Sequence, residues 1–308
     1  MDSPLSRVIL ATLGGLLLVL FFLSAYEWVL EEYPRRPAEP PNAKRVVHPL
    51  YHQTRIKALQ LFSRLPSLEK TAVKERLKSK LIPIKQWRTH LNQTDFQILC
   101  MGELHKESTR RFLAEELFAI LGIDVLLLEA TPGELKRLIK RLEAGRDYFP
   151  LLDADIMRVL RTVQARNPGI RIYGIEQTDK QATYDHDHSN PRDQCIAQNF
   201  WKTFEPGLRH IILFGALHCT NEPNWLFHNL CSRVSPDLKK KMLNVRVLGE
   251  HQNGPLEAFV DFIDEIGIEN KDFVIPDTRS LPECIYQWFP ILKRQTLDKY
   301  RSLVVFRS

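Results

Sequence analysis

Two histidine motifs share a layout that suits chemistry at the end of a strand. Gly102-Glu103-Leu104-His105 follows one short apolar run, and Gly215-Ala216-Leu217-His218 follows another. In an open α/β sheet, ligands bind outside the carboxyl ends of the strands, where both histidines and Glu103 would lie. Glycine lets the backbone turn sharply and approach a ligand there. The repeated motif therefore predicts a functional cleft.

Two further apolar runs end in carboxylates. Glu129 directly follows one run and Glu176 directly follows another. Because a charge beside a buried run is costly unless it is paired or hydrated, these groups should converge with the histidines. Such a set can perform general acid–base chemistry on a water nucleophile, or it can bind a divalent metal. The candidate metal ligands are His105, Glu129, Glu176 and His218.

Arg192 begins a further polar motif, Arg192-Asp193-Gln194-Cys195-Ile196-Ala197-Gln198-Asn199, which directly follows Pro191. We expect a helix here, with Arg192 and Asn199 on one face because they are seven residues apart. The guanidinium could hold a carboxylate, a phosphate or a transition-state oxyanion. The alternative is a surface arginine paired with Asp187 or Asp193.

Other polar groups have simpler interpretations. Asp185-His186-Asp187-His188 is either a solvated segment or a metal site, with His188 as the better ligand. Cys219 is a candidate nucleophile only through its neighbour His218. The chain has no G-x-S-x-G elbow, P-loop or G-x-G-x-x-G motif.

The elements that must position these groups alternate between strands and helices. We expect strands at 96–101, 125–129, 170–175, 210–214, 242–248, 273–275 and 302–306, and helices at 107–121, 131–145, 154–165, 190–206, 223–231 and 256–266. This alternation predicts an α/β fold with a mixed, largely parallel central sheet and helices on both faces. Thr131-Pro132-Gly133-Glu134 has the pattern of a capping box.

The chain before residue 95 divides by composition. Val8–Tyr26 is apolar and uncharged, close to the ~20 residues of a transmembrane helix, so residues 1–30 are predicted to be an uncleaved single-pass anchor rather than a signal peptide. Residues 31–49 form a Pro-rich linker, 50–94 a helical preface, and 95–308 the α/β domain. Residues 251–301 contain no motif that we can interpret.

Charge and cysteine usage limit the partners and the compartment. The net charge is +6, the basic residues are scattered along the chain, and no nucleic-acid motif is present. We therefore expect the chain to bind a membrane and a small-molecule or peptide substrate, and not to bind nucleic acid. Basic residues after the anchor, Arg35, Arg36, Lys44 and Arg45, slightly favour a cytoplasmic domain. Five widely spaced cysteines predict buried free thiols and a reducing compartment.

Taken together, these motifs resemble the superfamily of erythromycin esterase, the ChaN-like haem-binding proteins and the Tiki/TraB proteins. Its members have Gly-Glu-x-His, a later carboxylate, an Arg-(Asp/Asn) helix and Gly-x-x-His, which here fall at 102–105, Glu129, 192–199 and 215–218. The resemblance covers roughly residues 95–250. Lys106 replaces the usual Asp or Asn, and Cys195-Ile196 replaces the methionine-like position.

The resemblance implies a polar cleft in an α/β domain, and it leaves three functions open. The first is a hydrolase of ester or peptide bonds, acting with or without the help of a divalent metal (Mn, Co, Fe or Zn). Its catalytic residues would be Glu103, His105, Arg192 and His218. The second is a membrane-tethered haem or iron-binding protein, with His105, His218 or Tyr184 as axial ligands. The third is a degenerate domain that only binds a partner, against which the retained polar residues argue.

Overall fold

The computed structural model describes residues 49–93, 95–105, 107–118, 121–144, 151–182, 191–249, 255–268, 272–290 and 299–306. Residues 47–308 form one compact unit. The predicted anchor, nearly all of the linker and the segment 183–190, which holds Tyr184 and His188, lie outside the described residues. Within the described ranges, no helix is both long enough and apolar enough to cross a bilayer.

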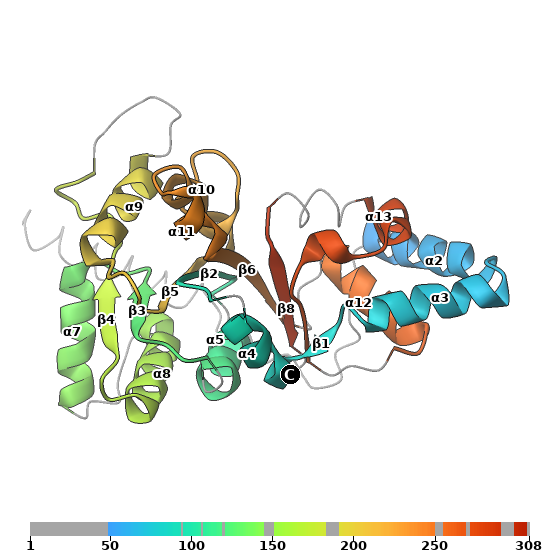
Figure 1. The fold of residues 1–308 in the computed structure, drawn as a ribbon. Helices are drawn as coiled ribbons and strands as arrows, with labels where there is room; N and C mark the ends of the chain where they lie inside the picture. The colour runs from blue at the N-terminus through green and yellow to red at the C-terminus, as the bar shows by residue number, and fades with distance from the viewer. Residues whose placement is uncertain are drawn as a thin grey trace, which may run out of the picture. The chain divides into compact units, whose positions relative to one another are not determined.

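The described part of the chain builds an eight-stranded mixed sheet (Figure 1). The strands lie in the order β1-β7-β8-β6-β2-β5-β3-β4, and the central pairs, from β8 to β4, are parallel. β7 runs antiparallel to β8 and β1 antiparallel to β7. The strands are β1 (Ile82–Pro83), β2 (Ile98–Glu103), β3 (Val125–Leu128), β4 (Arg171–Gly174), β5 (His210–Gly215), β6 (Met242–Gly249), β7 (Phe273–Ile275) and β8 (Ser302–Phe306). The predicted mixed, largely parallel sheet is confirmed.

Helices follow most strands, as the alternation predicts. They are α2 (Pro49–Ser63), α3 (Ser67–Lys78), α4 (Ile84–Gln93), α5 (Glu107–Phe112), the π-helical turn η1 (Leu113–Leu117), α7 (Pro132–Glu143), α8 (Leu151–Arg166), α9 (Pro191–Thr203), the 3₁₀ turn η2 (Ala216–Cys219), α10 (Leu226–Cys231), α11 (Pro236–Lys240), α12 (Pro255–Glu265), the 3₁₀ turn η3 (Thr278–Ser280) and α13 (Glu283–Trp288). The single helix expected at 107–121 is instead α5 continued by η1, and the Gly145 expected to end α7 lies outside the described residues.

Alternate residues of the parallel strands enter two different cores. In β2, Leu99 and Met101 pack with α5 and α8, whereas Ile98 and Cys100 pack with α9 and α10. Figure 1 shows α9 and α10 on one side of these strands and α5 and α8 on the other. Burial on both faces explains why the strands are continuous apolar runs, with every residue of β2, β3 and β5 buried.

The antiparallel end of the sheet is covered by segments from both ends of the described chain. α2 packs on α12 and α13 through Phe62, whose ring meets Phe262 and Trp288 edge-on at 6.0 and 6.2 Å. Burying each such side chain contributes about 1.5–3 kcal/mol. Two helices of the expected preface, α2 and α3, therefore share one apolar core with α12 and α13, whereas α4 joins the core that contains α5 and α8.

Candidate active site

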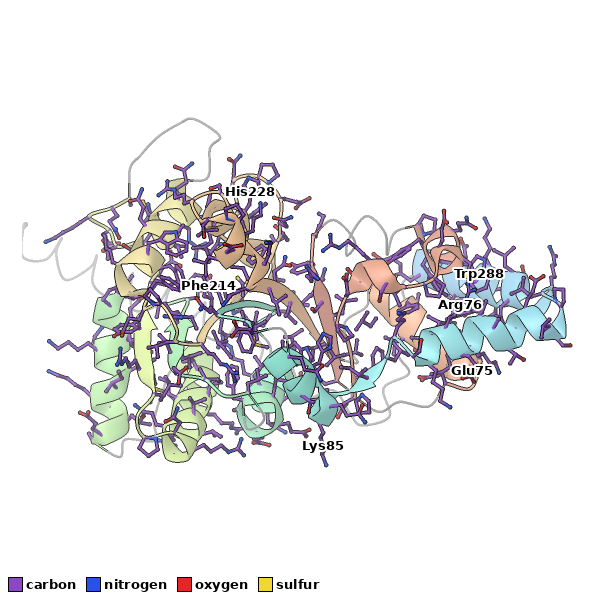
Figure 2. The ribbon with its side chains drawn as sticks, in the orientation of Figure 1. Glu75, Arg76, Lys85, Phe214, His228 and Trp288 are labelled. Carbon is purple, nitrogen blue, oxygen red and sulfur yellow. The ribbon has the colours of Figure 1, made fainter. Side chains whose placement is uncertain are left out.

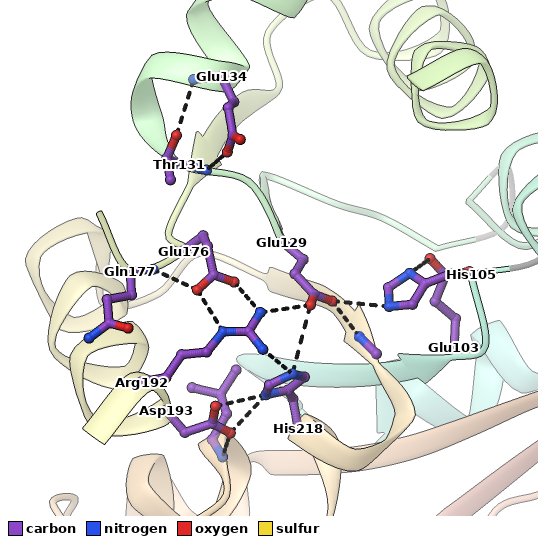
Figure 3. Close-up of polar contacts among 12 residues, drawn as sticks. Glu103, His105, Glu129, Thr131, Glu134, Glu176, Gln177, Arg192, Asp193 and His218 are labelled. Atoms are coloured by element: carbon purple, nitrogen blue, oxygen red, sulfur yellow. Dashed lines mark hydrogen bonds and ion pairs between the residues drawn. The ribbon is translucent and has the colours of Figure 1, made fainter. Parts of the chain in front are cut away.

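The carboxyl ends of β2, β5, β3 and β4 bring the candidate residues into one cluster (Figure 3). Glu103 ends β2 and His105 follows it, while Glu129, Glu176 and His218 follow β3, β4 and β5. A parallel arrangement places all these strand ends on one edge of the sheet. Arg192 enters from the first turn of α9 and contacts Glu129, Glu176 and His218.

A buried aspartate orients His218. Asp193 is fully buried, and its two oxygens lie 2.8 and 2.9 Å from Nδ1 of His218. The same carboxylate accepts a 2.7 Å hydrogen bond from the Leu226 N–H at the start of α10. Nδ1 therefore carries the proton donated to Asp193, and Nε2 accepts a hydrogen bond from Nη1 of Arg192 at 3.3 Å. Sequence reasoning treated Asp193 only as a surface partner for Arg192 and missed this role.

Arg192 is held by two carboxylates. Its Nε and Nη2 donate to the two oxygens of Glu176 at 2.9 and 2.7 Å, and Nη2 also donates to Glu129 at 3.0 Å. The hydrogen bonds that the guanidinium donates to Glu176 raise the pKa of Arg192 further above its ordinary value. A bidentate pair of this kind fixes the plane of the guanidinium, so Nη1 is aimed at Nε2 of His218.

Asn199 supports that pair indirectly. From α9 its amide donates to the carbonyls of Ile175 and Glu176 at 3.3 Å each, and its carbonyl accepts from Gln181 at 2.9 Å. These bonds tie the loop after β4 to the helix that carries Arg192. The predicted shared face of Arg192 and Asn199 thus positions one loop and one guanidinium together.

Glu129 lies between the two histidines. Its Oε2 is 3.3 Å from Nε2 of His105 and accepts the Gly215 N–H at 2.7 Å, and its Oε1 is 3.7 Å from Nε2 of His218. Burial raises the pKa of this carboxyl, but the hydrogen bonds from His105 and Gly215 outweigh burial and lower the pKa to about 2. Glu129 is therefore ionised at neutral pH.

The partners of His105 can accommodate both the protonated and the neutral ring. Hydrogen bonds to Glu103, and then to Glu129, raise its pKa to about 9, so the imidazolium donates to both carboxylates at neutral pH. Its Nδ1 also lies 2.9 Å from Nη2 of Arg110. A neutral ring would keep the Nε2–H bond to Glu129 and accept from Arg110 instead. His105 is thus suited to release and regain a proton in place.

The two motif glycines are needed for space rather than for an unusual backbone conformation. A Cβ on Gly215 would lie 2.9 Å from Nε2 of His105, and one on Gly102 would lie 2.9 Å from the Ala216 Cα. Neither glycine has a positive φ, whereas His105 does, at 50°. The sharp glycine turn that we expected is therefore wrong: His105 itself adopts the left-handed conformation, which costs a non-glycine residue about 1–2 kcal/mol.

A pocket of about 330 Å³ opens beside His105 and Glu129. Leu128, Leu138 and Ile156 form part of its wall, and Arg137 and Arg141 of α7 lie along it. α7 begins at the predicted capping box, with Thr131 Oγ1 accepting the Glu134 N–H at 3.2 Å and Glu134 accepting the Thr131 N–H at 2.7 Å. The box is confirmed, and it places α7 immediately after Glu129.

Glu103 is held through one of its two oxygens. Its Oε1 accepts from Arg110 Nε at 2.9 Å, while Oε2 is buried and has no hydrogen-bond partner among the described residues. Leaving a buried carboxylate oxygen unpaired is costly.

The predicted metal set is arranged around Arg192 instead of around a central void. In the described part of the chain, no three His, Cys, Asp or Glu side chains are placed to hold a metal ion. The guanidinium already occupies oxygens of Glu129 and Glu176 and faces Nε2 of His218. A cation bound by His105, Glu129, Glu176 and His218 would have to displace Arg192, so the donor set in this arrangement does not fit a metal.

Cys219 is not placed as a nucleophile. Its Sγ lies in the core, 2.7 Å from Sγ of Cys100, and burial raises the pKa of the thiol. In the part of the chain that the structure describes, Cys219 makes no hydrogen bond to the His218 ring, whose nitrogens face Asp193, Arg192 and Glu129.

Comparison with known proteins supports the fold alone. No family model matches, and no curated protein matches. A solved structure of a Bacillus cereus protein aligns over 77% of this chain and 97% of its own length, with a TM-score of 0.51 and 10% identity. Two toxin structures align less well: the effector domain RRSP from Vibrio vulnificus (TM-score 0.36, 16% identity, 65% of this chain) and the C-terminal region of Pasteurella multocida toxin (0.35, 12%, 61%). The chain spans 45% and 26% of those two structures.

Proposed function

We propose that the protein is a hydrolase that cleaves an ester or peptide bond with water as the nucleophile. The observation that carries this proposal is the buried Asp193–His218 pair, which leaves Nε2 of His218 as the acceptor of the ring, 3.7 Å from Glu129 at the pocket. An aspartate that holds a histidine in one tautomer is the arrangement that makes imidazole an effective general base.

The reaction follows from the positions of three groups. Nε2 of His218 takes a proton from water, and the water oxygen bonds to the substrate carbonyl carbon. Arg192, held by Glu176 and Glu129, offers Nη1 to the developing oxyanion. His105, protonated at neutral pH, donates to the leaving oxygen or nitrogen as the bond to carbon breaks. Solvent or Glu129, which lies between the two rings, returns the proton from His218 to His105.

The pocket beside His105 is proposed to receive the substrate. Its apolar wall at Leu128, Leu138 and Ile156 can cover a hydrocarbon portion of the substrate. We also propose that the chain is a divergent relative of the erythromycin esterase, ChaN-like and Tiki/TraB group. The support is that its four motifs meet at one site in the expected order along the chain.

The test is hydrolysis of p-nitrophenyl esters and fluorogenic peptides by the full-length chain in detergent. Activity should be lost in His218→Gln and His105→Gln and retained in His228→Gln, whose residue lies in α10 outside the contacts of the site (Figure 2). Full activity in both site variants, or no hydrolysis of either substrate class by the wild type, would reject the proposal.

Membrane attachment through residues 8–26 remains part of the proposal. The supporting feature is the uncharged apolar run in the sequence. Alkaline carbonate extraction of cell membranes should leave the full chain in the membrane fraction, and a chain lacking residues 1–30 should become extractable. Extraction of both forms would reject the anchor.

A further inference from the structure

Two cysteines meet in the core directly beneath the site. Cys100 lies in β2, three residues before Glu103, and Cys219 ends η2 and directly follows His218. Both are fully buried, and their sulfur atoms are 2.7 Å apart. The S–S bond of a disulfide is about 2.05 Å, and unbonded sulfur atoms normally stay much farther apart than these two.

The turn that carries Cys219 packs closely on the strand that carries Cys100. A Cβ on Gly102 of β2 would lie 3.2 Å from the Cys219 Cβ of η2. Asn244 donates to the Cys219 carbonyl at 2.9 Å, and the Tyr300 hydroxyl donates to the Ala216 carbonyl. Since η2 is fixed from the β6 side as well, the two sulfur atoms cannot easily separate.

We propose that Cys100 and Cys219 form an intrachain disulfide when the chain folds in the presence of a low-molecular-weight disulfide such as glutathione disulfide. In the exchange, one cysteine thiolate attacks the glutathione disulfide and releases one glutathione. The second cysteine then attacks the mixed disulfide and releases the other. Two electrons pass from the protein sulfurs to glutathione, and the two protons end on the released thiols.

The bond forms during folding and not in the finished structure. Both sulfur atoms are enclosed once β2 and η2 have packed, and burial raises the pKa of Cys219, so little reactive thiolate is present. The remaining cysteines, Cys195, Cys231 and Cys284, stay reduced. In the structure all five cysteines are free thiols, as expected, and an odd number of cysteines does not argue against one bridge formed on folding.

The bridge would join two of the strand ends that carry the site. It ties the end of β2, with Glu103 and His105, to the turn that carries His218. The proposal is independent of the hydrolase assignment.

The experiment counts thiols in the full-length chain, refolded in detergent with reduced and oxidised glutathione. The product is denatured and treated with a polyethylene-glycol maleimide, with or without prior reduction. Because the chain has five cysteines, wild type should take up three labels unreduced and five after reduction. Digestion without reduction should yield one linked pair of peptides containing Cys100 and Cys219. The bridged protein should melt roughly 10 °C higher than the reduced one.

Matched variants keep the outcome decisive. Cys100→Ala and Cys219→Ala should each show the same number of labels before and after reduction, whereas Cys231→Ser should still gain two labels on reduction. Five labels on unreduced wild type, or a linked peptide pair with any other cysteine, would overturn the proposal. The count is made on the wild-type chain, so a variant that fails to fold does not decide it.

Discussion

Asp193 and Arg192, neighbours in the first turn of α9, contact opposite nitrogens of the same imidazole. Asp193 lies 2.8 Å from Nδ1 of His218, and Arg192 lies 3.3 Å from its Nε2. Because one helix end fixes both sides of the ring, the tautomer and the direction of the Nε2 lone pair are set together.

Asp193→Asn should weaken His218 as the general base while keeping the site nearly isosteric. The amide can no longer hold Nδ1–H of His218 as an anion does, so we expect kcat to fall by about 10²–10⁴-fold. NMR of the imidazole nitrogens should show a changed tautomer population for His218. Asp237→Asn, on an exposed aspartate, is the control and should keep full activity. An unchanged tautomer and rate in Asp193→Asn would contradict the assigned role.

Arg192→Lys should preserve the charge and still lose activity. A lysine ammonium cannot donate to both oxygens of Glu176 and to Glu129 while facing His218. We expect a fall in kcat of about 10²–10³-fold with a smaller change in KM, measured by steady-state kinetics. The matched control is Arg233→Lys, at an exposed position outside the site. Equal kinetics in both variants would show that the planar guanidinium is not needed.

Gly215→Ala tests whether close packing sets the position of His105. The new Cβ would lie 2.9 Å from Nε2 of His105, so the ring must move away from Glu129. The pKa of His105, raised to about 9 in the wild type, should then move toward its ordinary value, as NMR titration can measure. Gly133→Ala is the control, because its Cβ would meet no atom closer than 4.0 Å. A pKa that stays near 9 in Gly215→Ala would refute this packing argument.

The stability of the domain should depend on pH through the same contacts. His105 has a folded pKa of about 9 against an ordinary 6.5, so its stabilisation is complete below pH 6.5 and is lost as pH rises through about 9. Glu129, with a pKa lowered to about 2, contributes above its ordinary 4.5 and loses that contribution as pH falls toward 2.

Urea unfolding at a series of pH values measures this dependence. Between pH 6.5 and 9 the free energy of unfolding should fall less in His105→Gln than in wild type. His228→Gln should leave the fall unchanged. Identical profiles for wild type and His105→Gln would mean that the two carboxylates do not hold the imidazolium.

Chelation separates the proposed water-based site from the predicted metal site. Since Arg192 occupies oxygens of Glu129 and Glu176, we expect activity to survive EDTA, and purified chain to carry no stoichiometric Mn, Co, Fe or Zn. Haem titration should give no Soret band dependent on His105 or His218. Loss of activity in EDTA that returns with one metal would favour a metal site over the metal-free one proposed here. Haem uptake that is abolished by a His105→Ala, His218→Ala double change would favour a haem-binding site.

The sequence by itself determined the fold class and most of the site. The apolar runs at β2, β3 and β5 are long enough and flanked clearly enough to locate the strands, because a strand buried on both faces must be continuously apolar. The end of a parallel strand also has a fixed place in the sheet, so Glu103, His105, Glu129, Glu176 and His218 could be grouped from strand ends alone.

Only the tertiary structure decided which of these side chains contact one another. Whether Arg192 or a metal balances Glu129 and Glu176 depends on the angle at which α9 meets the sheet, and no periodicity in the sequence encodes that angle. The same packing turned Asp193 inward to His218 and brought Cys100 of β2 beside Cys219 of η2. Local patterns fix which residues reach an edge of the sheet, whereas pairwise contacts there are set by helix–sheet packing, which is a property of the whole core.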